Sequence, residues 1–397
     1  MAPIDVDAER AATPGCTVVA HLDNAGSSLP TAATIAATVE HLRLEASIGG
    51  YEAAAAVESR LDAVRASAAT LLGAGRHEVA ITGSDTQSWT KALWGFLLGG
   101  GIARHQRVLV DRITYNSHYL GLLQIAALVG CRVDVVASRD DGALDLGALD
   151  DELARGDVAL VSATHVGTHR GLVNPVEEVG DACRRAGVAW FLDACQSLGQ
   201  IPLDVSRLGC AVLTATGRKW LRGPRGTGLL YVEAAVAERS RPPGIDGTSA
   251  HWVDATRYEL APGARRFEEF EVPYAAQLGL GVALDHVLAV GVDAVADAVA
   301  AHAQHLCTGL SGIDGVQLTD VGGPRCGIVS FEKAGVPPER IKQAATAAGM
   351  NVGISAAPWA RLDMDAAGQE SVVRASPHYY NTVDELDRLL DIVAGAR

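Results

Sequence analysis

The chain has 397 residues, of which 48% are hydrophobic, and its formal net charge at pH 7 is -14. This length exceeds what one hydrophobic core usually serves, so we expect two packed domains. The acidic balance argues against a nucleic-acid partner, because binding to a phosphate backbone uses clustered Lys and Arg. Composition therefore favours a multi-domain protein that acts on small molecules.

Cysteine usage and hydropathy bear on the cellular compartment. The seven cysteines are scattered and never spaced as CxxC, which is typical of reduced thiols rather than of a disulfide framework. The acidic N-terminus lacks the basic start and apolar stretch of a secretion signal. Charged residues interrupt the apolar stretch 282–301, so we expect no membrane span. These features predict a cytoplasmic protein.

The N-terminal part is predicted to be mainly helical. An extended segment at 17–22 and a turn-rich loop at 23–28 precede a helix at 30–46, which its first residue, a proline, is suited to open. A second helix is expected at 53–72, followed by a loop around 83–86.

In the middle of the chain, short apolar runs alternate with helical stretches. Strands that alternate with helices imply a mainly parallel sheet covered on both faces. The predicted strands are 107–110, 132–136, 158–162, 188–192 and 211–214.

From about residue 275 the pattern changes to that of a small α+β domain. It predicts helices at 275–310, 338–348 and 383–394 and strands at 327–331 and 372–375.

The boundary between the domains is placed within the helix that begins at residue 275. We expect an N-terminal segment (1–22) that packs with the small domain, a large domain (23–280) and a small domain (281–397). No low-complexity linker separates them, so the two domains should pack as one body.

Two charged residues follow predicted strands. Asp193 comes directly after the apolar run 188–192, so its carboxylate is expected at the carboxyl end of a strand, where open α/β sheets bind ligands. Lys219 follows the strand at 211–214, in a segment that reads TATGRKWLRGPRGTG at 214–228. An acid and an amine at one edge of a sheet indicate a ligand site.

The segment around Lys219 closely resembles the Schiff-base segment of the class V aminotransferase and cysteine desulfurase family. The resemblance implies that Lys219 binds pyridoxal 5'-phosphate (PLP) and that Asp193 keeps the pyridine nitrogen protonated, so that the ring draws electrons from the substrate's α-carbon. The adjacent Arg218 disfavours the ammonium form of the lysine. An exposed lysine on a basic loop, the alternative, does not account for the match over fifteen residues.

The resemblance covers residues 22–382, almost the whole chain. It implies an aspartate-aminotransferase-like fold, with a large PLP-binding domain built on a mainly parallel seven-stranded sheet and a small C-terminal α+β domain. It also implies a homodimer, because relatives complete each active site with residues from the other subunit.

Further roles follow from the resemblance, residue by residue. They are a neighbour of the PLP ring hydroxyl (Gln196), a hydroxyl that binds the phosphate (Thr216), the arginine that holds the substrate's α-carboxylate (Arg374) and two residues beside the substrate (Asn24 and Ala25).

The loop at 81–87 is expected to bind the phosphate of PLP at the N-terminus of a helix. The Thr86 hydroxyl would add a donor, whereas Asp85 is assigned through its backbone because a carboxylate is unfavourable beside a phosphate. The alternative is an ordinary helix start capped by Ser84 or Asp85.

Two positions depart from the usual residues of the family. Tyr115 falls where relatives place a ring, often a histidine, that stacks on PLP, and the alternative is a half-buried loop tyrosine. Thr168 stands where relatives often carry an asparagine near the ring hydroxyl, so it is assigned to cofactor binding with an open role.

A metal site is not expected. His165 and His169 are four residues apart, but Gly167 lies between them, the stretch follows a strand, and there is neither an HExxH pattern nor a third acidic ligand nearby. His169 is instead interpreted as a pocket-lining residue.

The reaction is predicted from what the chain contains and lacks. Arg374 can pair bidentately with the α-carboxylate, which leaves the α-hydrogen exposed to Lys219 as the base. Relatives that form a persulfide use a mobile cysteine upstream of the arginine segment, whereas residues 352–359 contain none and the last cysteine is Cys326. Cys195 is interpreted as a buried strand-end thiol.

The segments 49–52, 216–220 and 376–381 resemble the isopenicillin-N-epimerase-like branch, which includes lyases that act on cysteine S-conjugates. The leading hypothesis is therefore a C–S β-lyase that acts on an amino-acid substrate of this kind. Epimerisation and decarboxylating oxidation remain alternatives within the branch.

An alternative of another class is a non-catalytic, regulatory PLP-binding protein, which would not need the carboxylate clamp Arg374. Specificity for the substrate side chain stays open, and the candidate pocket residues are Tyr51, His118, Trp252 and Trp359.

Overall fold

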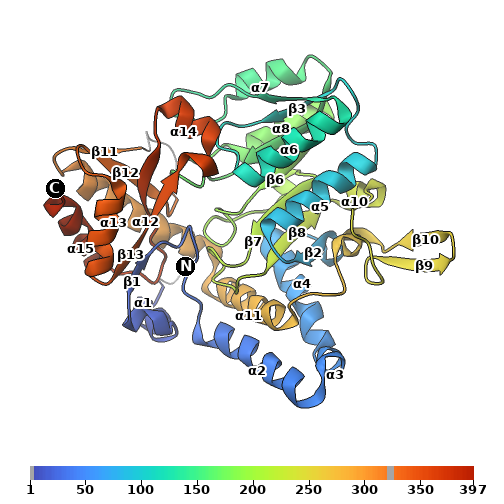
Figure 1. The fold of residues 1–397 in the computed structure, drawn as a ribbon, viewed down its shortest axis with the longest axis horizontal. Coiled ribbons are helices and arrows are strands. Elements are labelled where there is room, and N and C mark those ends of the chain that lie inside the picture. Colours follow the sequence, from blue (N-terminus) through green and yellow to red (C-terminus); the bar gives the residue numbers. More distant parts are fainter. Residues whose placement is uncertain (1–3, 320–325) are drawn as a thin grey trace.

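A seven-stranded sheet forms the centre of the larger part of the molecule (Figure 1). The computed structural model describes residues 4–319 and 326–397, so the first three residues of the predicted N-terminal segment lie outside it. The strand order is β2-β8-β7-β6-β5-β3-β4, and only β8 runs antiparallel to its neighbours among these strands. The strands are β2 (Val79–Thr82), β3 (Arg107–Val110), β4 (Arg132–Val135), β5 (Val158–Thr164), β6 (Ala189–Asp193), β7 (Val212–Thr216) and β8 (Gly228–Val232).

The mainly parallel, seven-stranded sheet is confirmed, and all five strands predicted for it are present. β2 and β8 were not predicted from their own patterns. The sheet is covered on both faces, because successive residues of β6 belong to different cores. Trp190 and Leu192 pack in one buried cluster and Phe191 in the other.

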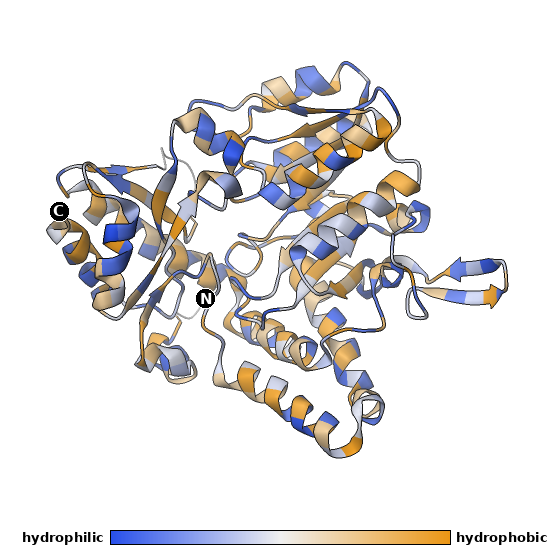
Figure 2. Cartoon of the chain, in the orientation of Figure 1, coloured by the Kyte–Doolittle hydropathy of each residue, from blue (hydrophilic) through white to orange (hydrophobic). Residues whose placement is uncertain are grey.

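Helices from the connections cover the sheet. They are η2 (Arg76–Glu78), α5 (Asp85–Leu98), α6 (Asn116–Val129), α7 (Leu146–Leu153), α8 (Val176–Ala186), α9 (Val205–Leu208), α10 (Ala234–Arg239) and η3 (Gly263–Phe267). Figure 2 shows hydrophobic and hydrophilic residues alternating along these helices, as expected for helices with one buried side.

The N-terminal helices differ from the prediction in two details. Thr31 rather than Pro30 starts the first long helix, because its hydroxyl accepts a hydrogen bond from the Thr34 N–H. The predicted helix at 53–72 is divided at the buried Val57, whose backbone leaves the helical region. The elements are α1 (Val6–Ala11), η1 (Pro14–Thr17), α2 (Ala32–Ile48), α3 (Gly50–Ala56) and α4 (Glu58–Leu72).

A second sheet, of five strands, forms the smaller part, in the order β1-β13-β14-β12-β11. Its strand β1 (Ala20–Leu22) comes from the N-terminal segment and pairs in parallel with β13. The C-terminal elements are β11 (Val316–Leu318), β12 (Val329–Lys333), α13 (Pro338–Ala347), β13 (Met350–Ala356), η4 (Ala357–Trp359), α14 (Arg361–Ala367), β14 (Ser371–Ala375) and α15 (Val383–Gly395).

The single helix predicted at 275–310 is wrong. The chain forms α11 (Tyr274–Val290) and α12 (Val292–Ser311), bent by 81° at Gly291, whose φ of 88° is readily adopted only by glycine. Helix α11 packs on α2 and α4, whereas α12 packs on α15 and β11, so the bend lies where the chain passes from one sheet to the other. Within the described ranges no single helix has the length and apolar composition to cross a membrane; only this bent pair does jointly.

A hairpin of β9 (Ala250–Asp254) and β10 (Arg257–Leu260) projects from the large part, at the right of Figure 1. Trp252 and Tyr258 are directly opposite each other on its strands and both are exposed.

Candidate active site

A cavity of about 100 Å³ lies at the carboxyl ends of β5, β6 and β7. Its lining includes all eight residues that the sequence assigned to the cofactor, from five separate segments of the chain. These residues are Asp85, Thr86, Tyr115, Thr168, Asp193, Gln196, Thr216 and Lys219.

The Lys219 loop is fixed on both sides. The Lys219 carbonyl accepts a hydrogen bond from the Arg222 N–H, and Arg222 in turn donates to the Leu29 carbonyl and the Tyr379 hydroxyl. Lys219 is buried, and burial lowers the pKa of its amine, with Arg218 and Arg374 acting in the same direction. A buried amine that loses its proton readily is suited to attack an aldehyde and to accept a proton.

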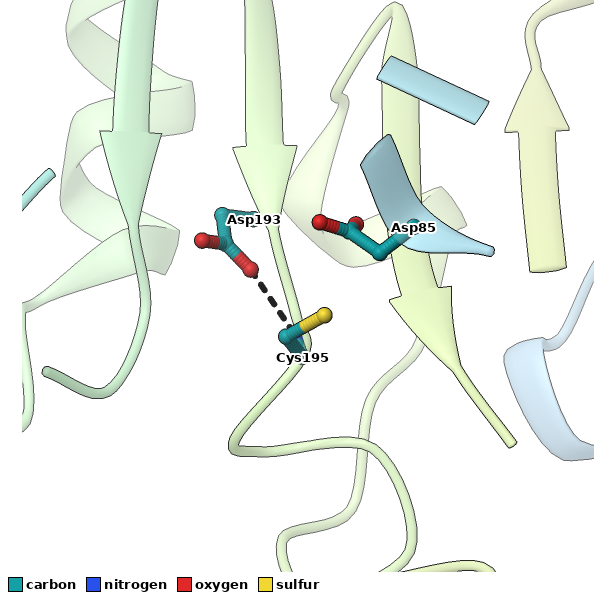
Figure 3. A group of neighbouring side chains, drawn as sticks. All are labelled: Asp85, Asp193 and Cys195. Atoms are coloured by element: carbon teal, nitrogen blue, oxygen red, sulfur yellow. Dashed lines mark hydrogen bonds between the residues drawn. The ribbon is translucent and has the colours of Figure 1, made fainter. Parts of the chain in front are cut away.

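Asp193 ends β6, as predicted, and lies beside a second acid. Its Oδ1 accepts from the Cys195 N–H at 2.8 Å. Figure 3 shows that the Asp85 and Asp193 carboxylates and the Cys195 thiol converge, and one ligand atom from each lies within 4.8 Å of the others. Burial, together with the neighbouring charge of Asp85, raises the pKa of Asp193, while His118 and Lys219 oppose that rise.

The loop before α5 has the geometry of a capped helix start. Ser84, not Asp85, is the cap, because its Oγ accepts from the Gln87 N–H at 3.1 Å. The Asp85 side chain turns to the interior and receives a hydrogen bond from His118, and the Thr86 hydroxyl donates to Ser117. The helix N-terminus and the Thr86 hydroxyl remain the groups suited to a phosphate.

Gln196 connects the cavity to the N-terminal segment. Its amide nitrogen donates to the Thr168 hydroxyl at 3.2 Å and to the Ala25 carbonyl at 3.1 Å, and its oxygen accepts from Trp220. Thr168, whose role was open from the sequence, therefore joins Gln196 to Arg374. The Thr216 hydroxyl donates to the Thr227 carbonyl at 3.4 Å.

Arg374 comes from β14 of the smaller sheet and adjoins the cavity through Thr168, which lines it. Its Nη1 donates to the Thr168 carbonyl at 2.6 Å and its Nη2 to Asp23 Oδ1 at 3.1 Å, while its buried Nε has no hydrogen-bond partner. The polar atoms of Asn24 are bound within the protein, to Ser376, His21 and Tyr380.

Tyr115 lines the cavity as a half-buried residue. Its ring centroid lies 6.0 Å from Lys219 Nζ. The ring also stacks on that of Trp359, with 6.5 Å between the two centroids and 8° between the two planes. Of the four residues considered for substrate specificity, Trp359 is the one that contacts this cavity residue. His118 is completely buried, and Tyr51 and Trp252 are exposed on α3 and on the hairpin.

His165 and His169 do not meet at a shared site. His169 bonds to the buried Asp363 at 2.5 Å, and burial lowers the pKa of His165 to about 4. Over residues 4–319 and 326–397, the one group of three possible metal ligands found is Asp85, Asp193 and Cys195. The roles of His118, Asp363 and Asp23 were missed, because each acts through partners that are distant in the sequence.

The cavity provides the groups that PLP requires. A buried amine, an acid at a strand end, an aromatic face and a helix N-terminus surround one space. The unpartnered Arg374 Nε adds a donor for a carboxylate. These groups fit PLP and an amino acid together.

Comparisons with known proteins agree with this fit. The chain is 28% identical to a probable cysteine desulfurase of Methanothermobacter thermautotrophicus, over 87% of each chain. It is 31% identical to a probable hercynylcysteine sulfoxide lyase of Mycobacterium tuberculosis, over 98% of this chain and 93% of the relative.

Among solved structures, the apo cysteine desulfurase of Thermococcus onnurineus NA1 matches with a TM-score of 0.92 at 23% identity, over 99% of this chain and 98% of that one. This likeness confirms the aspartate-aminotransferase-like fold. The family model for class V aminotransferases matches residues 20–389. The chain therefore belongs to the class V aminotransferase family, and its cofactor is pyridoxal 5'-phosphate.

Proposed function

We propose that this PLP enzyme is a C–S β-lyase that removes a thiol from a cysteine S-conjugate. The two relatives above bear different names, desulfurase and sulfoxide lyase, so their likeness alone does not select a reaction. The positions of the cysteine thiols in this chain support the lyase reaction over the desulfurase reaction.

The observation that carries the proposal is the absence of a thiol from the segment that faces Tyr115. Residues 350–367, from β13 through α14, contain no cysteine, and Trp359 is the residue that stacks on Tyr115. The cavity does contain Cys195, but burial raises the pKa of this thiol well above its usual range. A buried, protonated thiol is a poor acceptor for sulfur, which disfavours a persulfide-forming desulfurase.

Within this proposal the chain's own residues bind the substrate and move its proton. Bound PLP supplies an electron sink for the bond that breaks at the α-carbon. Arg374 binds the α-carboxylate, and its fixed guanidinium orients the α-hydrogen. Lys219 accepts that proton, and burial favours the neutral form of its amine by lowering its pKa.

The experiment is to incubate the purified holoenzyme with cysteine S-conjugates and to measure free thiol and pyruvate. Equal amounts of both products are expected, and Lys219→Ala should yield neither. Racemised substrate would replace the lyase with an epimerase, and consumption of oxygen with release of CO₂ would indicate decarboxylating oxidation. Substrate left untouched while PLP is bound would favour the regulatory protein.

The proposal includes a homodimer. The larger part of the molecule carries exposed aromatic side chains in two places, Tyr51 of α3 with Phe270, whose ring centroids are 6.2 Å apart, and Trp252 with Tyr258 on the hairpin. Exposed aromatic groups are enriched at protein interfaces. Sedimentation of the holoenzyme should give twice the mass of the chain, and a monomer that is fully active would contradict this part. A cytoplasmic location remains a prediction.

A further inference from the structure

Two acids lie side by side below the candidate cofactor site. Asp85 and Asp193 are 6% and 5% exposed, and their carboxylates lie within 4.8 Å of each other and of the Cys195 thiol (Figure 3). Burial and a neighbouring like charge both disfavour a second carboxylate anion. Without a cation between them, the two acids would share one proton.

His118 occupies the position of that cation. Its Nε2 is hydrogen-bonded to Asp85 Oδ2 at 2.9 Å, and its buried Nδ1 lies 3.5 Å from Asp193 Oδ2, within ion-pair distance but without hydrogen-bond geometry. Only the imidazolium form carries a proton on both nitrogens. Trp89 stacks on the same ring at 4.1 Å and 14°, which fixes its orientation and favours a positive charge.

The charges of the three residues depend on one another. Burial lowers the pKa of His118, but Asp85 and Asp193 outweigh burial and raise it from its ordinary value. Burial raises the pKa of Asp85, but His118 outweighs burial and lowers it to about 2. For Asp193, burial and Asp85 raise the pKa, and the main opposing group is His118. Lys219 faces the same site and disfavours the charge of His118.

We propose that Asp85, His118 and Asp193 form a positioning relay, in which Asp85 holds the charge on His118 and His118 keeps Asp193 as the anion that accepts the pyridine N–H of PLP. This inference rests on the assignment of Asp193 in the proposed function. Asp85 and His118 are positioning residues, because they act through Asp193 rather than on the substrate.

The test is a double-mutant cycle with His118→Gln, Asp85→Asn and the combined variant. The readouts, taken without substrate, are the affinity of the apoenzyme for PLP and the pH at which the visible band of the bound cofactor changes. His118→Gln should weaken PLP binding by about 10- to 100-fold, because Asp193 then takes up a proton and a charge-assisted hydrogen bond is lost. Asp85→Asn alone should have a smaller effect.

The combined variant separates the relay from a merely structural role. Asp193 no longer faces a second carboxylate in this variant, so PLP affinity and the pH of the spectral change should return to the values of Asp85→Asn. Losses that multiply in the combined variant, or a His118→Gln variant with unchanged affinity, would overturn the relay. His165→Gln is the matched control, since His165 is equally buried and has no carboxylate partner; its PLP affinity should be that of the unaltered enzyme.

A second measurement keeps the proposal testable if His118→Gln does not fold. The ¹⁵N spectrum of ring-labelled histidines in the holoenzyme should contain one buried ring that is still doubly protonated above the ordinary histidine pKa of about 6.5 and becomes neutral in Asp85→Asn. The absence of such a ring would refute the relay. These readouts need no substrate, so a failed β-elimination assay would reject the proposed reaction and leave the relay standing.

Discussion

Asp23 Oδ1 accepts a hydrogen bond from Arg374 Nη2 at 3.1 Å, so the residue expected to bind the substrate's carboxylate already holds a carboxylate of the protein. The pair joins the start of the large part to β14 of the smaller sheet. Gly26 and Gly353 surround the Asp23 carboxylate, and a Cβ on either glycine would lie within 3.0 Å of it. Positions 26 and 353 therefore need to be glycine to leave room for the Asp23 carboxylate. The negative charge of this carboxylate opposes that of an incoming substrate carboxylate.

Asp23→Asn removes that opposing charge while leaving an oxygen that can accept from Arg374. We expect KM for the amino-acid substrate to fall about fivefold, the size of an effect from one part-exposed charge, with kcat less affected. Steady-state kinetics measure this split, and Asp151→Asn, an exposed acid on α7, serves as the control. A rise in KM would mean that Asp23 serves only to orient Arg374.

Arg374→Gln tests the clamp itself. The substrate's carboxylate would lose a charged, bidentate partner, so KM should rise about 100-fold or more. The affinity for PLP should fall much less, because among the described residues the guanidinium is hydrogen-bonded to Thr168 and Asp23 and not to Lys219 or Asp193. Comparable losses in PLP affinity and in KM would show that the arginine supports the whole cavity instead.

The core of the site was predictable because its signals are local. Asp193 directly follows a buried apolar strand, and Lys219 lies in a segment whose every residue contributes to the resemblance. The relay was not predictable, because Asp85 and His118 are 33 positions apart on two helices that meet only in the folded chain. From the sequence, Asp85 was interpreted as a phosphate-loop residue or a helix cap, and His118 as a candidate pocket residue.

The fold shows the same division between local and tertiary signals. The parallel strands were visible as apolar runs. In contrast, β8 is antiparallel and pairs with β2, and its register joins Val79 to Tyr231 and Thr82 to Gly228, which are 152 and 146 positions apart in the sequence. The helical pattern continues through Gly291, so the bend becomes evident only from the packing of α11 on α2 and α4 and of α12 on α15 and β11.

Lys219→Ala should abolish turnover, because the chain would lose both its attachment point for PLP and its proton acceptor. Treatment with borohydride should fix the cofactor on the unaltered enzyme and leave the variant unlabelled, as measured by the mass of the intact protein. Arg225→Ala, in the same loop, is the control and should still be labelled. Turnover and labelling that survive in Lys219→Ala would refute the assignment of this lysine.

Trp359→Ala tests whether the residue stacked on Tyr115 contacts the departing group. An aromatic contact is worth about 1 kcal/mol, so KM for conjugates with an aromatic thiol should rise about fivefold. S-methylcysteine, which cannot reach the ring, serves as the internal control and should be converted with little change. An equal loss for both substrates would indicate that Trp359 only supports Tyr115.

We expect Asp363 to stabilise the contact between α14 of the smaller part and the larger part. It is fully buried on α14 and lies 2.5 Å from His169, 2.7 Å from Arg170 and 2.5 Å from Arg112. Asp363→Ala would deprive Arg170 and Arg112 of this ion-pair partner and His169 of its hydrogen-bond partner, so we expect the free energy of unfolding to fall by about 3–5 kcal/mol. Asp365→Asn on the same helix is the matched control, because its ion pair with Arg361 is exposed and should contribute less than about 1 kcal/mol.

The same carboxylate predicts how stability changes with pH. Burial raises the pKa of Asp363, but His169 and the two arginines outweigh burial and lower it below the ordinary value. A group whose pKa is lower in the folded state stabilises fully above its unfolded pKa, about 4, and loses that contribution as pH falls through the folded pKa. Denaturant unfolding at a series of pH values should therefore show the gap between the unaltered enzyme and Asp363→Ala narrowing below about pH 4. A gap that stays constant into the acid range would show that Asp363 stabilises by packing and not by its charge.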